Sequence, residues 1–221
     1  MTRRCLILFV KSPEAEGVKS RLAAVIGEEK ARALYRHFVV DLLATLDRVG
    51  EGHRLTIFFH PPEHRSILET WLGHDRIYEP QQGNDLGERM RDAFERCFAE
   101  GFETVVLVGC DIPDMPGEIV RAGFAELESA DAVIGPSRDG GYYLIGFRSG
   151  AFVPEIFRGM SWGTDGVLWS TRERLDARGL RLAFVPLWSD IDTYEDLAAL
   201  IERHRNTPFA GSGTVRCFLS M

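Results

Sequence analysis

Short segments that are apolar throughout alternate along this chain with longer segments whose apolar residues recur at helical spacing. Residues 5–10 (CLILFV) are continuously apolar, as a strand that is covered on both faces should be. Residues 28–49 place apolar side chains about every 3.6 residues, which predicts one long amphipathic helix. Because helices separate most of the expected strands, we predict an α/β fold, a three-layer α/β/α sandwich with a mainly parallel sheet.

The remaining elements follow from the same two patterns. Further strands are expected at residues 54–59, 76–79, 104–109, 132–135, 142–147 and 180–186. Further helices are expected at residues 63–72, after 85, at 116–128 and at 194–204. The turn Asp139–Gly141 is too short to hold a helical crossover, so one antiparallel element is expected within the sheet.

Polar residues at three positions are expected to cap helices. Asp85 and Glu88 have the spacing of a capping box at the start of one helix. Thr193 stands where the last helix needs an N-cap, and Asp114 stands just before the helix that is expected to begin at Pro116.

Composition fits one globular domain. The chain has 221 residues, 45% of them hydrophobic, which is enough to build a core and excludes disorder as its main state. Residues 1–205 are expected to form that domain, and residues 206–221, with their proline and glycines, an irregular C-terminal tail. The net charge of −7 argues against a broad surface for nucleic acid or anionic membrane.

The sequence shows no pattern typical of a targeting peptide or of a membrane-spanning segment. The apolar run 5–10 is far too short to cross a membrane, and no small-residue cleavage pattern follows it, so a cytoplasmic protein is expected. The four cysteines form no CxxC pair and are expected to be reduced. His60 and His64 have no third metal ligand near them in sequence, so no metal site is expected there.

The loop after the first strand carries an unusual concentration of lysine. Of 26 basic residues only three are lysines, and Lys11 and Lys19 both lie in this loop, next to Ser20 and Arg21. Ligands of open α/β sheets bind beyond the carboxyl ends of the strands, and a phosphate there needs backbone N–H groups and cations. We therefore expect these four residues to bind phosphate; an ordinary solvated basic loop is the alternative.

Aspartates follow two other strands at the same predicted edge of the sheet. Asp111 comes directly after the strand at 104–109, where packing does not require an acid. Asp190 and Asp192 precede the last helix, and one of them is expected to complete a cation site with Asp111. Two carboxylates together with phosphate oxygens suit Mg²⁺ or Mn²⁺, so we predict a metal-bound diphosphate.

Two further stretches add candidate binding residues. The stretch 81–89 supplies amides and a flexible turn for a base or ribose, unless it is only a helix start; its candidates are Gln82, Gly83, Leu86 and Arg89. The stretch 135–143 combines two glycines with an acid and two tyrosines, and its candidates for an acceptor or sugar are Asp139, Gly140, Gly141 and Tyr142. A plain hairpin would explain the glycines but not the whole cluster.

Six motifs in order resemble the rSAM/selenodomain-associated transferase family. They are KSPEAEGVKSRLA, QQGNDLGERM, GCDIPDMP, GPSRDGGYYLIG, WGTD and DIDTYEDL, spread over residues 6–200. The resemblance implies a GT-A fold, a nucleotide-diphospho-sugar donor, a link to arsenosugar biosynthesis, a metal-binding role for Asp111, and an acceptor side that includes Trp162 and Thr164. The segments 19–22 and 190–193 also resemble phospholactate guanylyltransferase and the molybdenum-cofactor nucleotidyltransferases, whereas the GxGTR signature of sugar pyrophosphorylases is absent.

The leading hypothesis is a metal-dependent glycosyltransferase. Lys19 and Arg21 would stabilise the leaving diphosphate, and Asp139 would orient or deprotonate the acceptor hydroxyl. The first alternative is a guanylyl- or cytidylyltransferase that joins an NTP to a small phosphorylated substrate and releases pyrophosphate. The second is a nucleotide-binding protein without turnover. The expected partners are a nucleotide sugar or NTP and a small-molecule acceptor.

Overall fold

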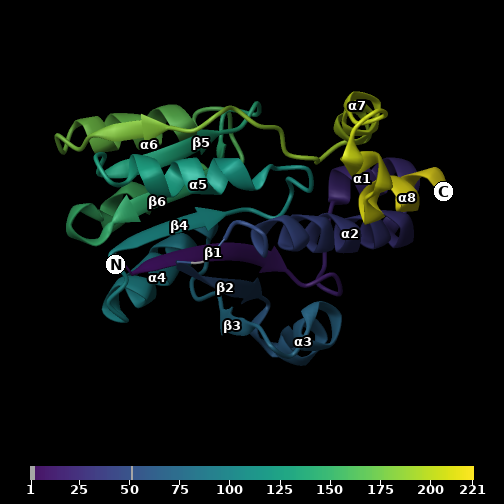
Figure 1. Ribbon diagram of the computed structural model, residues 1–221, viewed down its shortest axis with the longest axis horizontal. Coiled ribbons are helices and arrows are strands. Elements are labelled where there is room, and N and C mark those ends of the chain that lie inside the picture. Colours follow the sequence, from purple (N-terminus) through teal and green to yellow (C-terminus); the bar gives the residue numbers. More distant parts are fainter. Residues whose placement is uncertain (1–2, 51) are drawn as a thin grey trace.

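Seven strands form one mixed sheet in this computed structural model, which describes residues 3–50 and 52–221. The strand order is β3–β2–β1–β4–β6–β5–β7 (Figure 1). The strands are β1 (Arg4–Lys11), β2 (His53–His60), β3 (Ile77–Pro80), β4 (Thr104–Val108), β5 (Ala132–Pro136), β6 (Tyr142–Arg148) and β7 (Leu182–Phe184). Strand β6 runs antiparallel to β4 and β5 and the other pairs are parallel, which confirms the predicted antiparallel element.

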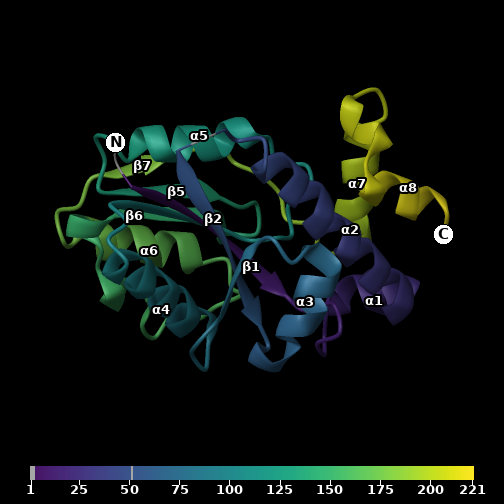
Figure 2. The same ribbon diagram turned by 60° about the horizontal axis from the view of Figure 1, so that its bottom comes forward.

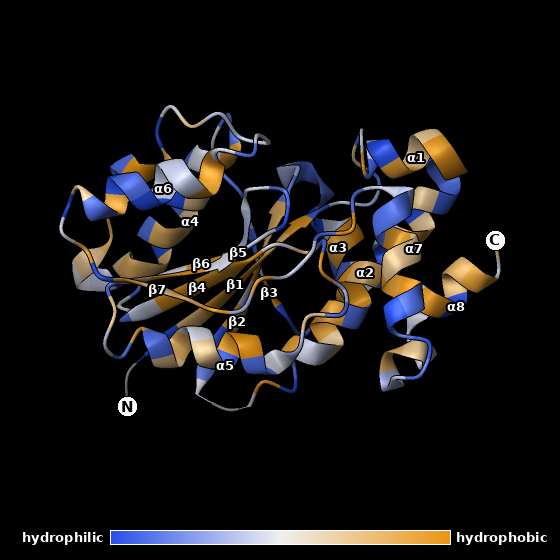
Figure 3. Ribbon diagram, turned by 90° about the horizontal axis from the view of Figure 1, so that it is seen from above, coloured by the Kyte–Doolittle hydropathy of each residue, from blue (hydrophilic) through white to orange (hydrophobic). Residues whose placement is uncertain are grey.

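Helices cover both faces of this sheet. They are α1 (Ser20–Ile26), α2 (Glu28–Leu46), α3 (Arg65–Leu72), α4 (Leu86–Ala99), α5 (Gly117–Glu126), α6 (Val167–Asp176), α7 (Tyr194–Arg203) and α8 (Gly213–Leu219). Viewed along the sheet, α4 and α6 lie on one face and α5 on the other (Figure 3). The predicted three-layer sandwich is therefore confirmed. The described residues contain no helix that is long and apolar enough to cross a membrane.

Strand β1 shows why a continuously apolar segment is needed at the centre of the sheet. Leu6, Leu8 and Val10 pack into the core under α2 and α5, whereas Cys5 and Ile7 pack into the opposite core under α4 and α6. Successive side chains of a strand point to opposite faces, so a strand buried on both faces has no position for a polar residue.

A third apolar cluster lies beyond the end of the sheet, where α1, α7 and α8 gather around α2 (Figure 2). Leu22 of α1, Phe38 of α2 and Leu197 of α7 are fully buried in it. This cluster anchors α1, and with it the preceding basic loop, against α7, the helix that follows Asp190 and Asp192.

The C-terminal segment differs from the prediction. Residues 206–221 are not irregular: they form the 3₁₀ turn Pro208–Gly211 and helix α8. Ser212 caps α8, and Asp41 of α2 accepts the backbone N–H groups of Gly213 at 3.0 Å and Thr214 at 2.7 Å. The capping carboxylate comes from a helix far away in the sequence, so local composition could not reveal it.

Smaller differences concern element limits and caps. Helices α1 and α6 were not predicted, and β7 is shorter than the expected 180–186. The helix expected at 63–72 begins as the 3₁₀ turn Pro62–His64. Asp85 caps α4 as predicted, but the carboxylate of Glu88 accepts from the N–H of Asn84 instead of completing the box. Thr193 and Asp196 do form a full capping box on α7.

Candidate active site

Two adjoining cavities open beyond the carboxyl ends of β1 and β4. The first has a volume of about 490 Å³ and the second of about 370 Å³, and Lys11, Cys110, Asp111, Asp139 and Gly163 line both. The chain runs from β1 outward to β2 and β3 and then returns to β4 on the other side of β1. The cavities thus lie at the topological switch point, where open α/β sheets bind ligands.

Lys19 joins two of the predicted acidic segments. Its Nζ lies 2.7 Å from Oδ1 of Asp111 and 2.7 Å from Oδ1 of Asp192, and its side chain is only 4% exposed. Burial lowers the pKa of this ammonium, but the two carboxylates outweigh it and raise the pKa to about 12. Lys19 is therefore charged at physiological pH, and the basic loop, the β4 loop and the loop before α7 meet at one point.

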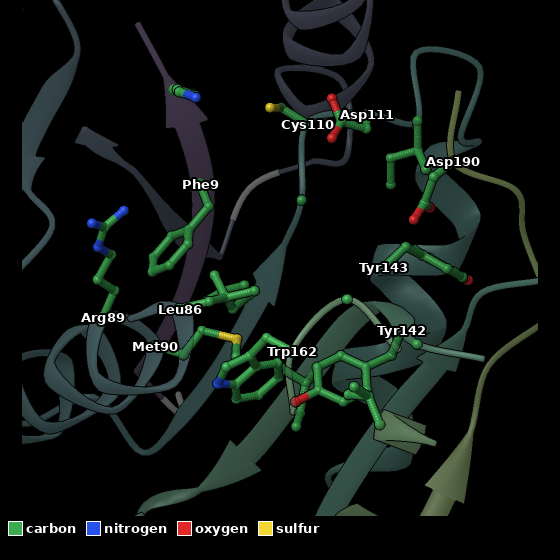
Figure 4. Close-up of a pocket in the computed structure, with 18 of the residues that line it drawn as sticks. Phe9, Leu86, Arg89, Met90, Cys110, Asp111, Tyr142, Tyr143, Trp162 and Asp190 are labelled. Atoms are coloured by element: carbon green, nitrogen blue, oxygen red, sulfur yellow. The ribbon is translucent and has the colours of Figure 1, made fainter. Parts of the chain in front are cut away.

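Asp190 lies apart from this ion pair, on the wall of the first cavity (Figure 4). Its Oδ1 is buried and has no hydrogen-bond partner among the described residues. Burial raises the pKa of this carboxyl to about 7, and the charges of Asp111, Asp139 and Asp192 add to the effect. An unpaired buried carboxylate is costly, so this group needs a proton or an added cation.

These carboxylates fit a divalent cation of the kind that binds phosphates. Within the described part of the chain, no three acidic, histidine or cysteine side chains are grouped closely enough to enclose a metal on their own. Magnesium usually takes one or two carboxylates and completes its shell with water and phosphate oxygens. Asp111 and Asp190 both line the first cavity and can supply that pair, whereas Asp192 lines only the second; Lys19 pairs with one oxygen of Asp111 just as it does with one oxygen of Asp192.

Cationic side chains lie on the opposite wall of the first cavity. Lys11 and Arg89 line it and are close enough for each charge to act on the other; burial first and then Arg89 lower the pKa of Lys11. His60 lines the same wall, and burial followed by Arg89 and Lys11 lowers its pKa as well. This wall therefore favours an anion, which would relieve the repulsion among these groups.

The inner end of the first cavity is aromatic. Trp162 and Tyr142 pack edge to face with ring centroids 6.4 Å apart, and Phe9, Leu86 and Met90 complete this end (Figure 4). Gly87 of α4 makes this packing possible. A Cβ atom at Gly87 would come within 2.8 Å of the Trp162 ring and would clash with the Phe157 carbonyl oxygen.

Most of the predicted site residues line these cavities. Those on the first are Lys11, Leu86, Arg89, Asp111, Asp139, Gly141, Tyr142, Trp162, Thr164 and Asp190. The second is lined by Lys11, Lys19, Ser20, Arg21, Asp111, Asp139 and Asp192. Gln82, Gly83 and Gly140 line neither cavity. The neighbouring Gln81 lines the first one, and Gly140, at φ +86°, lies too close to the Asp165 backbone to accept a side chain.

Asp114 does not cap a helix, contrary to the prediction. Its fully buried carboxylate binds the indole N–H of Trp188 at 3.1 Å, the guanidinium of Arg203 at 2.7 Å and Nε2 of His204 at 2.8 Å. The N-cap of α5 is Pro116, without a side-chain hydrogen bond. Asp114 instead ties the loop that carries Asp111 to α7.

Several lining residues were not predicted, among them Phe9, His60, Gln81, Met90, Cys110, Tyr143 and Val167. Most of them are apolar or lie inside regular elements, where a residue type gives no sign that one side faces a cavity. Phe9 and His60 could have been predicted as lining residues, because they stand at the carboxyl ends of β1 and β2, where open α/β sheets bind their ligands.

The sequence is similar to those of known proteins. Residues 44–164 match the family described as an uncharacterized protein conserved in bacteria, DUF2064. The chain is 32% identical over 187 residues to 3-phospho-D-glycerate guanylyltransferase of Phenylobacterium zucineum (strain HLK1), and the match covers 81% of this chain and 82% of that protein.

Solved structures extend the likeness over the whole chain. A crystal structure from Desulfovibrio desulfuricans G20, provisionally named a nucleotide-diphospho-sugar transferase, is 41% identical and has a TM-score of 0.94; the match covers 100% of this chain and 95% of that one. The 4-diphosphocytidyl-2C-methyl-D-erythritol synthase of Anaerococcus prevotii DSM 20548 is 14% identical with a TM-score of 0.63, covering 93% and 97%, and shares the fold alone.

Proposed function

Because the chain belongs to the DUF2064 family, and is a transferase like the relatives it matches, we propose that it transfers a nucleotidyl group from an NTP to a small phosphorylated acceptor. The observation that carries the proposal is the cationic loop at Lys19, Ser20 and Arg21, which lines a cavity beside the carboxylates. A leaving pyrophosphate needs such a loop, and the name of the 32% identical relative supports the same reaction.

The reaction follows from where the charges lie. A phosphate oxygen of the acceptor attacks the α-phosphorus of the NTP, the bond from that phosphorus to the bridging oxygen breaks, and pyrophosphate leaves. Lys19 and Arg21 stabilise the negative charge that collects on the pyrophosphate. Lys11 and Arg89 hold the anionic groups on the first cavity's wall, so that attacking and leaving oxygens stay in line.

A divalent metal belongs to this proposal. Asp111 and Asp190 would hold Mg²⁺ or Mn²⁺, which supplies charge neutralisation between the phosphates when it is bound. The unpaired buried oxygen of Asp190 supports this assignment. Asp192, which lines only the second cavity, holds Lys19 together with Asp111, so Asp111 would serve both the metal and the lysine.

A second candidate is glycosyl transfer from a nucleotide-diphosphate sugar. The provisional name of the 41% identical structure favours it, and so does Asp139, which lines both cavities. One oxygen of Asp139 accepts the Gly141 N–H at 2.9 Å, which orients the carboxylate for deprotonating an acceptor hydroxyl. Nucleotidyl transfer to a phosphate needs no such base, so the two reactions differ in their need for Asp139. The arsenosugar and radical-SAM connections stay predictions.

The purified protein tests the choice directly. With Mg²⁺ or Mn²⁺ and a panel of NTPs and small phosphorylated acceptors, we expect pyrophosphate release that depends on the acceptor. Asp139→Asn should keep at least about a third of that rate, whereas loss of a true general base costs 10²–10⁴-fold. Release of a nucleoside diphosphate from nucleotide sugars, without pyrophosphate from any NTP, would establish the second candidate instead.

A further inference from the structure

The aromatic end of the first cavity has a composition that metal and phosphate binding do not explain. Trp162 stacks on Phe157 at 6.5 Å between centroids and meets Tyr142 edge to face. Leu86, at the start of α4, lines the cavity yet leaves 44% of its surface exposed. Metal, phosphate and ribose have no use for these apolar surfaces, whereas a flat ring, of the acceptor or of the nucleobase, would cover them.

The charges of the cavity lie elsewhere. Figure 4 places Asp111 at the end opposite Trp162, with Arg89 and Asp190 on the two side walls. Arg174, a cation whose charge acts on Tyr142, does not line the cavity and donates to the carbonyl oxygens of Ile156 and Arg158. An anionic group at the aromatic end would therefore lie among apolar rings without a cation to pair with it.

Tyr142 adds a polar contact at this end. Its hydroxyl points toward Trp162 in Figure 4, is buried, and has no hydrogen-bond partner in the part of the chain that the structure describes. The hydroxyl of Thr171 on α6 is close enough to act on that of Tyr142, but it is fully buried and does not line the cavity. A buried hydroxyl without a partner is costly, so a ligand with a polar substituent at its far end would gain by reaching the hydroxyl of Tyr142.

We propose that the acceptor carries its reacting phosphate at one end and a neutral, flat, apolar ring at the other, which binds between Trp162, Tyr142 and Leu86. This inference rests on the proposed transfer at the same site. It separates this chain's acceptor from 3-phosphoglycerate, the acceptor in the name of the guanylyltransferase relative. That molecule would place a carboxylate among rings, in a cavity that the carboxylates of Asp139 and Asp190 also line.

Calorimetric titration with phenyl phosphate tests the ring directly. The full chain is loaded with Mg²⁺ and a non-hydrolysable GTP or CTP analogue, and 3-phosphoglycerate serves as the comparison ligand. We expect phenyl phosphate to bind at least about tenfold more tightly than 3-phosphoglycerate, since a buried ring gains about 1.4 kcal/mol or more from apolar and aromatic contact. Equal or tighter binding of 3-phosphoglycerate would overturn the inference.

Variants locate the effect. Trp162→Ala should weaken phenyl phosphate binding about tenfold while the affinity for the nucleotide analogue stays within about threefold, which also shows that the variant is folded. Trp162→Phe should restore most of the binding. Trp169→Ala, which removes a 65% exposed tryptophan of α6, is the matched control and should change neither affinity.

The outcomes separate the inference from the proposed reaction. If Trp162→Ala weakens the nucleotide analogue but not phenyl phosphate, the rings hold the base and the inference is wrong. If phenyl phosphate binds as expected but no NTP yields pyrophosphate, the result supports the ring-binding site and contradicts the proposed nucleotidyl transfer. If pyrophosphate is released with 3-phosphoglycerate as the preferred acceptor, the result supports the nucleotidyl transfer and contradicts the ring-binding site.

Discussion

Lys19 has a left-handed backbone conformation, with φ +50° and ψ +47°, that residues other than glycine rarely adopt. The conformation directs its ammonium into the narrow space between Asp111 and Asp192. Strain of this kind persists when the surrounding contacts compensate for it, and here the compensation is a buried ion pair with two carboxylates. One residue thus joins the basic loop to two acidic loops.

Substitution of Lys19 separates strain from function. Lys19→Gly accepts the backbone conformation without cost but lacks the ammonium, so kcat/KM should fall at least about 100-fold. Lys19→Met should lose a similar factor and also destabilise the fold, since it keeps the strain and leaves two carboxylates facing each other. The control for Lys19→Met is Lys30→Met, which removes an exposed lysine of α2 and should leave the steady-state kinetics unchanged. Lys30→Gly is not used as a control, because glycine inside a helix would lower stability by itself.

Asp190 makes stability depend on pH when no metal is bound. Its pKa in the folded protein is about 7 against 3.8 as the ordinary value, so the folded state binds the proton more tightly than the unfolded state does. The contribution of this group to stability is therefore complete below about pH 4 and is lost as pH rises through 7.

Replacement by a neutral amide should remove that dependence. In EDTA at pH 8, we expect Asp190→Asn to melt about 2–4 °C or more above the parent, because about 1 kcal/mol shifts Tm by that amount in a chain of this size. At pH 4 the difference should vanish, and Mg²⁺ should raise Tm only in the parent. A constant difference across this pH range, measured by calorimetry, would contradict the assignment.

At the scale of elements, α8 shows how tertiary contacts decide structure in a segment with weak local signals. It has only seven residues, too few to be stable alone, and its first two N–H groups bind the carboxylate of Asp41 on α2. We expect Asp41→Ala to lower the unfolding free energy by about 1–2 kcal/mol, as for the loss of an N-cap. Glu126→Ala on the exposed face of α5 is the control in the same denaturant titration.

The apolar periodicity of the sequence predicted the strands of the central sheet and most of the helices that pack on it. The apolar run of β1, the stripe on α2 and the antiparallel β6 after its short turn are all present. Helices α1 and α6 were not predicted, since each is short and buries few residues: Leu22 in α1, and Val167, Thr171 and Leu175 in α6. Asp114 was misassigned because its partners Trp188, Arg203 and His204 lie far away in the sequence.

At the scale of the whole molecule, the strand order explains why the charged site residues were foreseeable. Polar residues at the carboxyl ends of β1 and β4 and in the loop before α7 had no packing reason to be there, and the switch point brings them together. It was not foreseeable that Lys19 would pair with Asp192 and not with Asp190, because this depends on which carboxylate the lysine reaches in the fold. The apolar wall was equally hidden, since its residues look like core.

The central claim is that one site holds a metal-bound polyphosphate between these carboxylates and the basic loop. Calorimetric titration of GTP and CTP with and without Mg²⁺, on the parent and on Asp111→Ala, tests it most directly. We predict that the parent binds at least one of them in a Mg²⁺-dependent manner, and that Asp111→Ala loses at least about tenfold in affinity together with that dependence. Unchanged affinity and unchanged Mg²⁺ dependence in Asp111→Ala would contradict the account.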